Sequence, residues 1–262
     1  ENKITNFKKR LDSLENNCKV IISAPDYPYR CPPAPYERAS MIANYLKGKS
    51  IKFKILIFDS KNSFTKKSIF LKEWKEMYGN SVEWISKQNG GLITRFEKKK
   101  VFNSDGEKIK GDFIHIIPEQ KAGKIIFDSK LCKNDWCTID PQTFQLLNFK
   151  DIYAVGDSVD AGDMPKSAFS AESQAKILSL NLINRILQKS YLNPVFLNTC
   201  YSFSSNDRAF SITSWYKLNT VKDRIVSLGS SESSVDGLNN ERIRESKEAF
   251  GWYESITKTL YG

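Results

Sequence analysis

The chain has 262 residues, a net charge of +10 and a hydrophobic fraction of 40%, which suit a folded globular protein rather than a disordered one. No run of about twenty apolar residues occurs, so no membrane-spanning helix is predicted. The 40 basic residues are scattered along the chain, which argues against a nucleic-acid-binding function and favours docking to an acidic partner protein. Five cysteines are too few for a disulfide scaffold, and their odd number leaves at least one thiol unpaired.

The first third of the chain alternates between strand and helix patterns. The expected elements are, in order, a helix over 3–17, a strand over 18–24, a proline-dense loop over 25–35, a helix over 36–46 and a strand over 53–59. Ser63 is expected to cap a further helix that ends at Gly79. This order is typical of a parallel sheet with right-handed crossovers.

The rest of the chain is less regular. Residues 82–117 read as short strands with turn signals at Asn89-Gly90 and Asp105-Gly106, which predict a β-meander. A strand over 151–155 is expected before Gly156, and a helix should follow it. Short alternating segments between 198 and 229 predict strands, and the chain should end in a helix.

The first turn from strand to helix lacks a dinucleotide-binding fingerprint. Such a site needs glycines that let the backbone approach a pyrophosphate. Here Ser23, Ala24 and Pro25 begin a string of prolines, which remove amide donors. Asp59 ends the second strand, where a ribose-binding acid can sit, but we interpret it as an ordinary strand-end residue. We therefore expect no nicotinamide nucleotide in this part of the chain.

Cys31 lies in the same proline-dense loop, at the carboxyl end of the predicted sheet where ligands bind in such folds. The neighbouring Arg30 favours a thiolate, and Glu37 supplies a carboxylate that can move protons. The alternative is that Cys31 is a small buried residue without chemistry.

The segment around Gly156-Asp157 carries a flavin signal. Glycine lets the chain approach a ligand closely, and the aspartate presents one acceptor, which flavoproteins use for the ribityl hydroxyls. Lys166 and Ser167 then place positive charge and free amides at a helix start, where an anionic reduced flavin is stabilised. The alternative is a simple capped helix.

The other candidates carry less information. Cys200 alone gives no signal, and Cys18, Cys132 and Cys137 read as structural thiols. The single histidine, His115, lies in an apolar strand, so no metal-ligand spacing is present and no metal site is expected.

Several blocks together indicate a known family. They are YRCPPAPYERAS (29–40), IIPEQKAGKI (116–125), YAVGDS with MPKSAFSAESQAK (153–158 and 164–176), NTCYS (198–202) and GWYESITKTLYG (251–262). In this order the sequence resembles the flavin-binding subunit of flavocytochrome c sulfide dehydrogenase, a relative of the sulfide:quinone oxidoreductases and of the FAD-dependent pyridine nucleotide-disulfide oxidoreductases. Ala168 departs from the glycine more common there.

The resemblance implies an α/β flavoprotein fold with two Rossmann-like dinucleotide-binding domains, present in part, and a small α+β C-terminal domain. The implied domains are a second nucleotide-binding-like domain over 1–117, the returning half of the FAD-binding domain over 118–190 and the C-terminal domain over 191–262. The match begins partway into the family's pattern. We therefore expect the glycine fingerprint, a flavin-attaching cysteine and an export signal outside these residues, and weak FAD binding by this segment alone.

The resemblance also implies a function, with sulfide as substrate, FAD as cofactor, a cytochrome c haem subunit as partner and a periplasmic location. It assigns a redox-active disulfide to Cys31 and Cys200, with Cys200 nearer the flavin, and an acid/base role to Glu37. The implied flavin contacts are Gly156 and Asp157 at the ribityl chain, Lys166 and Ser167 at the pyrimidine end, and Thr199 and Trp252 between flavin and haem.

Two alternatives stay open. A sulfide:quinone oxidoreductase would favour an amphipathic C-terminal membrane anchor, whereas the last predicted helix is short and carries charges through its first half. A non-catalytic relative would keep the fold and only bind a partner. Retention of both Cys31 and Cys200 argues against the second alternative.

Overall fold

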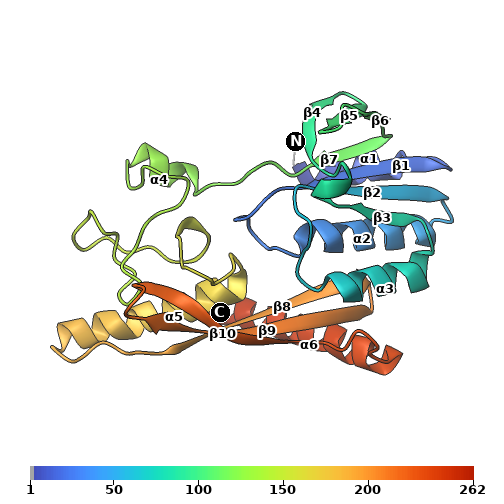
Figure 1. The fold of residues 1–262 in the computed structure, drawn as a ribbon. Coiled ribbons are helices and arrows are strands. Elements are labelled where there is room, and N and C mark those ends of the chain that lie inside the picture. The colour runs from blue at the N-terminus through green and yellow to red at the C-terminus, as the bar shows by residue number, and fades with distance from the viewer. Residues whose placement is uncertain (1–2) are drawn as a thin grey trace.

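The computed structural model describes residues 3–262 and contains a parallel sheet and two antiparallel sheets (Figure 1). The parallel sheet has the order β3-β2-β1-β7. Its strands are β1 (Cys18–Ala24), β2 (Phe53–Asp59), β3 (Val82–Ile85) and β7 (Phe113–Ile116). Helices α1 (Lys3–Asp12), α2 (Ala34–Gly48) and α3 (Lys67–Tyr78) accompany it. The predicted alternation of strand and helix is confirmed, because all three strand pairs are parallel.

The predicted meander is smaller than expected. Strands β4 (Ile93–Glu97), β5 (Lys100–Asn103) and β6 (Lys108–Lys110) form the antiparallel sheet, but β3 and β7 on either side join the parallel sheet. Asp105-Gly106 lies between β5 and β6 as predicted. Asn89-Gly90 instead ends the 3₁₀ helix η1 (Lys87–Asn89), where Gly90 adopts a left-handed φ of 82°.

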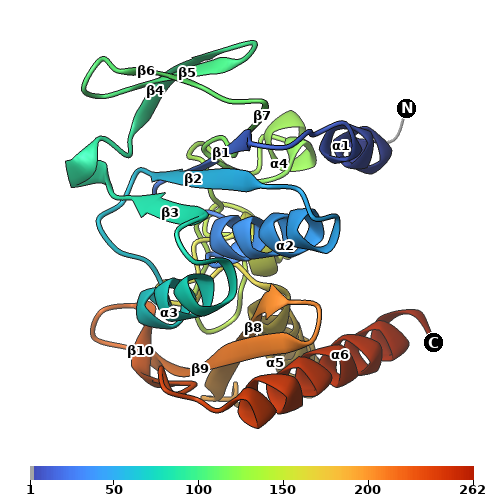
Figure 2. The same ribbon diagram turned by 90° about the vertical axis from the view of Figure 1, so that its right-hand side faces the viewer.

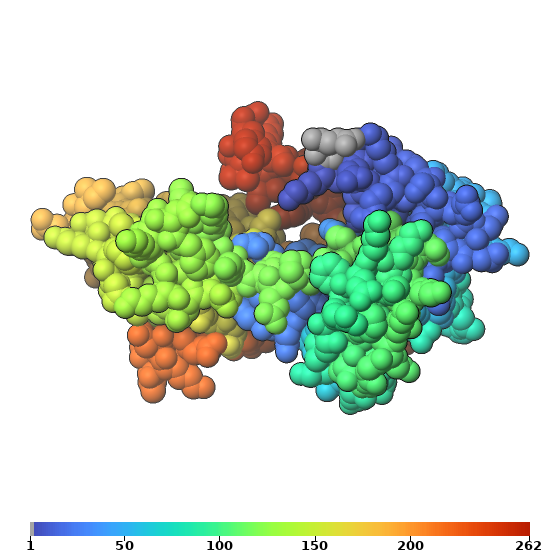
Figure 3. All heavy atoms as spheres, turned by 90° about the horizontal axis from the view of Figure 1, so that it is seen from above, coloured from blue at the N-terminus to red at the C-terminus, as the bar shows by residue number. Residues whose placement is uncertain are grey.

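The segment between β7 and α5 is mostly irregular and lies to one side of the N-terminal body in Figure 3. It holds α4 (Lys124–Asp128) and the 3₁₀ helix η2 (Gly156–Ser158). The predicted strand over 151–155 is wrong, because Tyr153 makes only an isolated bridge to Gln145. A β-strand needs a neighbour along its length, and this one has none among residues 3–262.

The C-terminal part is an antiparallel sheet of order β10-β9-β8 with two long helices. These elements are α5 (Ala168–Ile186), β8 (Val195–Ser205), β9 (Arg208–Asn219), β10 (Arg224–Glu232) and α6 (Asn239–Tyr261). Strand β8 packs against α2, while α5 contacts β8 and α6 contacts β9 (Figure 2). The C-terminal sheet thus lies against the N-terminal body. None of the helices in residues 3–262 is long and apolar enough to cross a membrane.

The start of α3 differs from the expectation. Ser63 does not cap the helix; Lys66 occupies the N-cap position, with a left-handed φ of 62° and no side-chain capping bond. The Lys66 carbonyl accepts the amide of Phe70, and its side chain turns into the protein, where it is 2% exposed. The end of α3 follows the prediction, because Gly79 closes it with a φ of 62°.

A buried carboxylate joins α3 to the C-terminal part. Glu73 is 2% exposed and forms ion pairs at 3.0 Å with Arg208 of β9 and Arg242 of α6. The Ser204 hydroxyl of β8 also donates to it at 2.7 Å. Burial opposes ionisation of Glu73, but the bonds from Arg208, Ser204 and Arg242 win and lower its pKa. The network is satisfied only when all four elements are in place.

Replacing Glu73 by Gln should destabilise the protein by about 3 kcal/mol or more, because two arginines lose their counter-charge in a buried site. Denaturant unfolding of the full-length protein measures this. Since the folded-state pKa is lowered, the stabilisation is present above the unfolded carboxyl's pKa and is lost as the pH falls through the folded value. The difference between the two proteins should therefore shrink in acid.

The matched control is Glu76→Gln, on the exposed side of the same helix. Its partner, Lys72, is 3.8 Å away across one helical turn, and the change should stay within about 0.5 kcal/mol. Equal losses from both substitutions would contradict the role given to Glu73.

Candidate functional site

Cys31 sits in a loop that is pinned to the residues preceding α5. Its amide donates to the Lys166 carbonyl at 2.7 Å, and Arg30 forms a β-bridge with Lys166. The Tyr29 hydroxyl closes the loop by donating to the Pro32 carbonyl at 2.7 Å. Cys31 itself has a left-handed φ of 52°. The proline-dense sequence thus builds a stiff support for one thiol.

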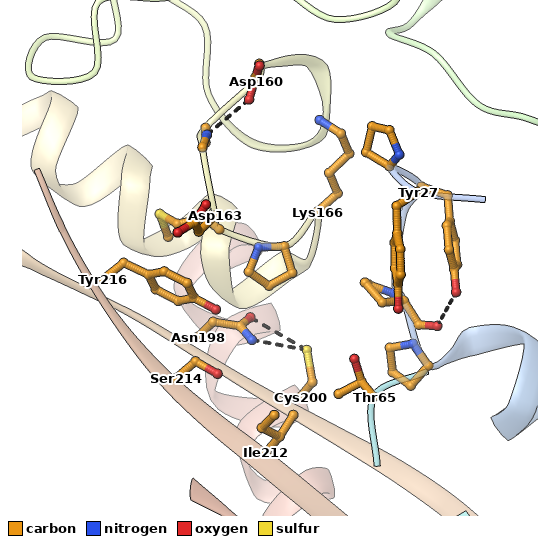
Figure 4. A pocket seen from close by; sticks show the side chains of 18 of the residues that line it. Tyr27, Thr65, Asp160, Asp163, Lys166, Asn198, Cys200, Ile212, Ser214 and Tyr216 are labelled. Carbon is orange, nitrogen blue, oxygen red and sulfur yellow. Dashed lines mark hydrogen bonds between the residues drawn. The ribbon is translucent and has the colours of Figure 1, made fainter. Parts of the chain in front are cut away.

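Cys200 lies on β8 and points into a cavity beside Asn198 (Figure 4). The Asn198 side-chain amide donates to the Cys200 sulfur at 3.4 Å. The other side of that amide, Oδ1, accepts from Ser167 Oγ at 2.5 Å and from Ser170 Oγ at 3.2 Å. Ser167 also caps α5 by accepting the Ser170 amide. Asn198 therefore links the Cys200 thiol to the start of α5.

Glu37 lies in the first turn of α2 and reaches β8. Its Oε1 accepts the Phe203 amide at 3.0 Å, three residues beyond Cys200 in the chain. Burial raises the pKa of the Glu37 carboxyl, although the Phe203 amide, Lys66 and Arg38 favour its charged form. A carboxyl with a raised pKa holds a proton more readily than an ordinary carboxyl, which suits a general acid or base.

The surroundings of Cys31 favour the neutral thiol. The residue as a whole is exposed, but the protein packed around its sulfur desolvates the thiolate. That desolvation, with the nearby Glu37 and Cys200, raises the pKa of Cys31 to about 12, while Lys66 acts in the opposite direction. Both Cys31 and Cys200 are free thiols in the structure.

Two cavities meet at Cys200. One, of about 510 Å³, is largely apolar and is lined by five of the predicted site residues: Cys31, Ser167, Thr199, Cys200 and Trp252. The other, of about 470 Å³, lies beyond the Cys200 side chain between the Tyr27–Tyr29 loop and β9 (Figure 4). Lys166 lines this second cavity. Cys200 thus stands in the wall between them.

The side chain of Lys166 is turned away from the first cavity. Its Nζ donates to the Val159 carbonyl at 2.5 Å and lies 3.8 Å from the centre of the Trp136 ring. Burial lowers the pKa of Lys166 to about 8, opposed by the charges of Asp157 and Asp160. Trp252, by contrast, faces the first cavity and stacks on Phe169 of α5, with ring centres 5.8 Å apart.

Gly156 and Asp157 lie in η2, outside both cavities. Gly156 has a φ of 72°, and a Cβ there would meet the Ala171 Cβ at 3.0 Å, so only glycine fits between η2 and α5. Asp157 Oδ2 pairs with Arg30 at 3.4 Å. Its Oδ1 is buried and has no hydrogen-bond partner among residues 3–262.

A buried acceptor without a donor is unfavourable unless a ligand supplies the donor. The hydroxyls of a flavin ribityl chain are such donors, so the residues present here fit a flavin. Asp59 is different, because Tyr36, Lys61 and Trp84 occupy its carboxylate completely. It is a structural residue, as the sequence suggested.

The parallel sheet, the capped α5 and the orphan acceptor of Asp157 fit a flavoprotein of the Rossmann-like oxidoreductase class. Two family models match the chain. "Sulfide dehydrogenase [flavocytochrome c] flavoprotein chain, central" matches residues 5–118, and "Flavocytochrome c sulphide dehydrogenase, flavin-binding" matches residues 192–260. The chain therefore belongs to the family of flavocytochrome c sulfide dehydrogenase flavoprotein chains, and its cofactor is FAD.

Several solved structures share this fold at low sequence identity. The covalent putidaredoxin reductase–putidaredoxin complex matches with a TM-score of 0.55 and 12% identity over 92% of this chain and 60% of that one. The ferredoxin reductase of the CYP199A2 system from Rhodopseudomonas palustris matches with a TM-score of 0.53 and 14% identity over 87% of this chain and 58% of that one. A chain of the Tetrahymena thermophila mitochondrial ATP synthase matches with a TM-score of 0.53 and 17% identity over 78% of this chain and 52% of that one. The chain thus spans between half and three-fifths of their lengths.

Sequence reasoning missed two residues of the site. Asn198 was recognisable in principle, because residues two apart on a strand share a face and Cys200 is two positions on. Lys66 gave no signal, since it is one of 40 basic residues and its contacts come from β8.

Replacing Glu37 by Gln should make Cys31 more reactive. The substitution removes a negative charge that raises the Cys31 pKa, so the thiolate forms at lower pH. Alkylation of the reduced full-length protein, followed peptide by peptide in mass spectrometry, should become several-fold faster for Cys31 at pH 9. The exposed Glu83→Gln on β3 is the control and should change nothing. Slower alkylation in the Glu37 variant would contradict the electrostatic assignment.

Proposed function

We propose that the protein oxidises sulfide through a Cys31–Cys200 disulfide and FAD and passes the electrons to a cytochrome c subunit. One observation carries this proposal most. Two cysteines from opposite ends of the chain line one apolar cavity together with the start of α5 and Trp252. The family match supports a flavin at this place.

The chemistry at the sulfurs is a thiol–disulfide exchange. Hydrosulfide attacks Cys31, the Cys31–Cys200 bond breaks, and a new sulfur–sulfur bond gives a persulfide on Cys31 and a thiolate on Cys200. One negative charge enters with the substrate and one leaves on Cys200, so the step balances. Glu37 accepts the proton that hydrosulfide brought to the persulfide. Its raised pKa suits it to hold this proton. FAD, when bound, supplies a two-electron acceptor that can release electrons singly.

In this proposal the flavin lies in the cavity that both cysteines line. The apolar cavity with Ser167, Thr199 and Trp252 takes the flavin ring, and Thr199 and Trp252 lie toward the haem partner. Asp157 holds the ribityl chain beside Gly156. At the pyrimidine end Lys166 contributes only its backbone beside Ser167, because its side chain is turned away from this cavity.

The organisation of the whole protein is part of the proposal. Residues 1–117 form the second nucleotide-binding-like domain, 118–190 the returning half of the FAD domain, and 191–262 the C-terminal domain. The location is periplasmic. A quinone acceptor and a purely partner-binding role are the alternatives to a cytochrome partner, and a titration with sulfide distinguishes them.

The test is an anaerobic titration of the native full-length protein with sulfide, followed by visible absorption. We expect sulfide to bleach the flavin band, and we expect Cys31→Ser or Cys200→Ser to abolish the bleaching. Cys18→Ser, a buried thiol on β1, is the control and should leave it intact. Electrons should then pass to an added cytochrome c and not to a quinone.

A flavin that is indifferent to sulfide would refute the substrate and point to another sulfur compound or thiol. A protein without flavin would leave only the partner-binding alternative.

A further inference from the structure

Lys66 is a buried cation that no step described so far uses. Its Nζ donates to the Cys200 carbonyl and to Ser202 Oγ, both at 2.8 Å, and lies 5.4 Å from the centre of the Phe210 ring. The residue is 2% exposed. Burial of an ammonium group costs free energy, which these neutral partners offset only in part.

Buried lysines are usually paired with a carboxylate, and Lys66 differs in this respect. Lys61, another buried lysine, is paired with Asp59 at 2.6 Å. Lys66 has no carboxylate within salt-bridge distance in residues 3–262. The acidic groups near enough to act on its charge are Cys31 from the proline loop, Glu37 from α2, Cys200 from β8 and Glu232 from β10.

Burial lowers the pKa of Lys66 to about 8, and ionised Cys200, Glu37 and Cys31 would each raise it. The interaction is reciprocal, because a charge that is favoured by an anion favours that anion equally. The charge on Lys66 therefore favours the formation of a thiolate at Cys31 or Cys200.

We propose that Lys66 is a positioning residue for the sulfur chemistry. Its ammonium group fixes the Cys200 backbone and supplies the positive charge that stabilises the thiolate released on Cys200 when the disulfide opens. The inference rests on the proposed function for the origin of that thiolate. The charge itself acts on the reduced thiols whatever reductant forms them.

A purely structural role is the alternative. In that case Lys66 would only tie the start of α3 to β8, and its loss would lower stability without changing thiol ionisation. Ser202→Ala separates the two roles, because it removes one hydrogen bond of the same Nζ and leaves the charge in place.

The experiment measures thiol reactivity against pH. The full-length protein with FAD is reduced and exposed briefly to iodoacetamide between pH 6 and 10, and the Cys31 and Cys200 peptides are quantified by mass spectrometry. The variants are Lys66→Gln, which keeps a donor to the Cys200 carbonyl, Lys66→Met, Lys66→Arg and Ser202→Ala. Unfolding midpoints of all four are recorded in parallel.

We expect Lys66→Gln and Lys66→Met to slow Cys200 alkylation about tenfold at pH 7.5, with the plateau at high pH unchanged. Lys66→Arg and Ser202→Ala should stay within about twofold of the native protein. Titration curves of Lys66→Gln that coincide with those of the native protein, or with those of Ser202→Ala, would overturn the proposal.

The result is independent of the substrate. If sulfide fails to bleach the flavin but Lys66→Gln still shifts the thiol titration, the sulfide assignment fails and the role of Lys66 stands. If sulfide bleaches the flavin but Lys66→Gln does not shift the thiol titration, the sulfide assignment stands and the role of Lys66 fails.

Discussion

The site depends on the edge of β8 that no other strand in residues 3–262 pairs with. Because β8 is the last strand of its sheet, its outward-facing backbone groups have no neighbouring strand to bond. Side chains of the N-terminal body satisfy them instead. Glu37 accepts the Phe203 amide, Lys66 donates to the Cys200 carbonyl, and the Tyr78 hydroxyl donates to the Ser204 carbonyl at 2.5 Å.

These bonds have two consequences at once. They prevent the edge from pairing with another chain, and they hold Cys200 against the loop that carries Cys31. The Glu73 network strengthens the same joint, since Ser204 of β8 is one of its donors. Glu37 and Lys66 therefore join the two halves of the fold and also act on the thiols.

Desolvation sets the electrostatics of the site. It raises the pKa of Cys31 and of Glu37 and lowers that of Lys66, so each group moves toward its neutral form. A site that disfavours isolated charge responds strongly when a single anion forms in it. An anion on either sulfur would then be stabilised by the positive charge of Lys66.

Local sequence signals predicted the elements well where the determinants are local. The boundaries of β1 and β2 follow from short apolar runs, the end of α3 from Gly79, and the start of α5 from Ser167. The strand expected over 151–155 failed because a strand depends on a partner, which the apolar pattern cannot reveal. Ala154 and Val155 pack around the core of Cys137 and Phe144 instead, while Ile152 is exposed.

The sequence predicted the site only in part, for the same reason. Motifs placed Cys31, Glu37, Ser167 and Cys200 near one another through a family resemblance, and the structure does bring Cys31, Ser167 and Cys200 to one cavity. Lys66 could not be found, because its partners at Cys200 and Ser202 are more than 130 residues away in the chain. Tertiary contacts at that separation leave no trace in a single sequence.

The central claim is that Cys31 and Cys200 act as a redox pair, and disulfide mapping of the native full-length protein tests it most directly. The protein is alkylated without reduction, digested and examined for linked peptides. We expect a peptide that joins Cys31 to Cys200, which disappears when a stoichiometric amount of sulfide is added without air. Two freely alkylated thiols in the oxidised protein, or either cysteine linked to a different partner, would contradict the claim.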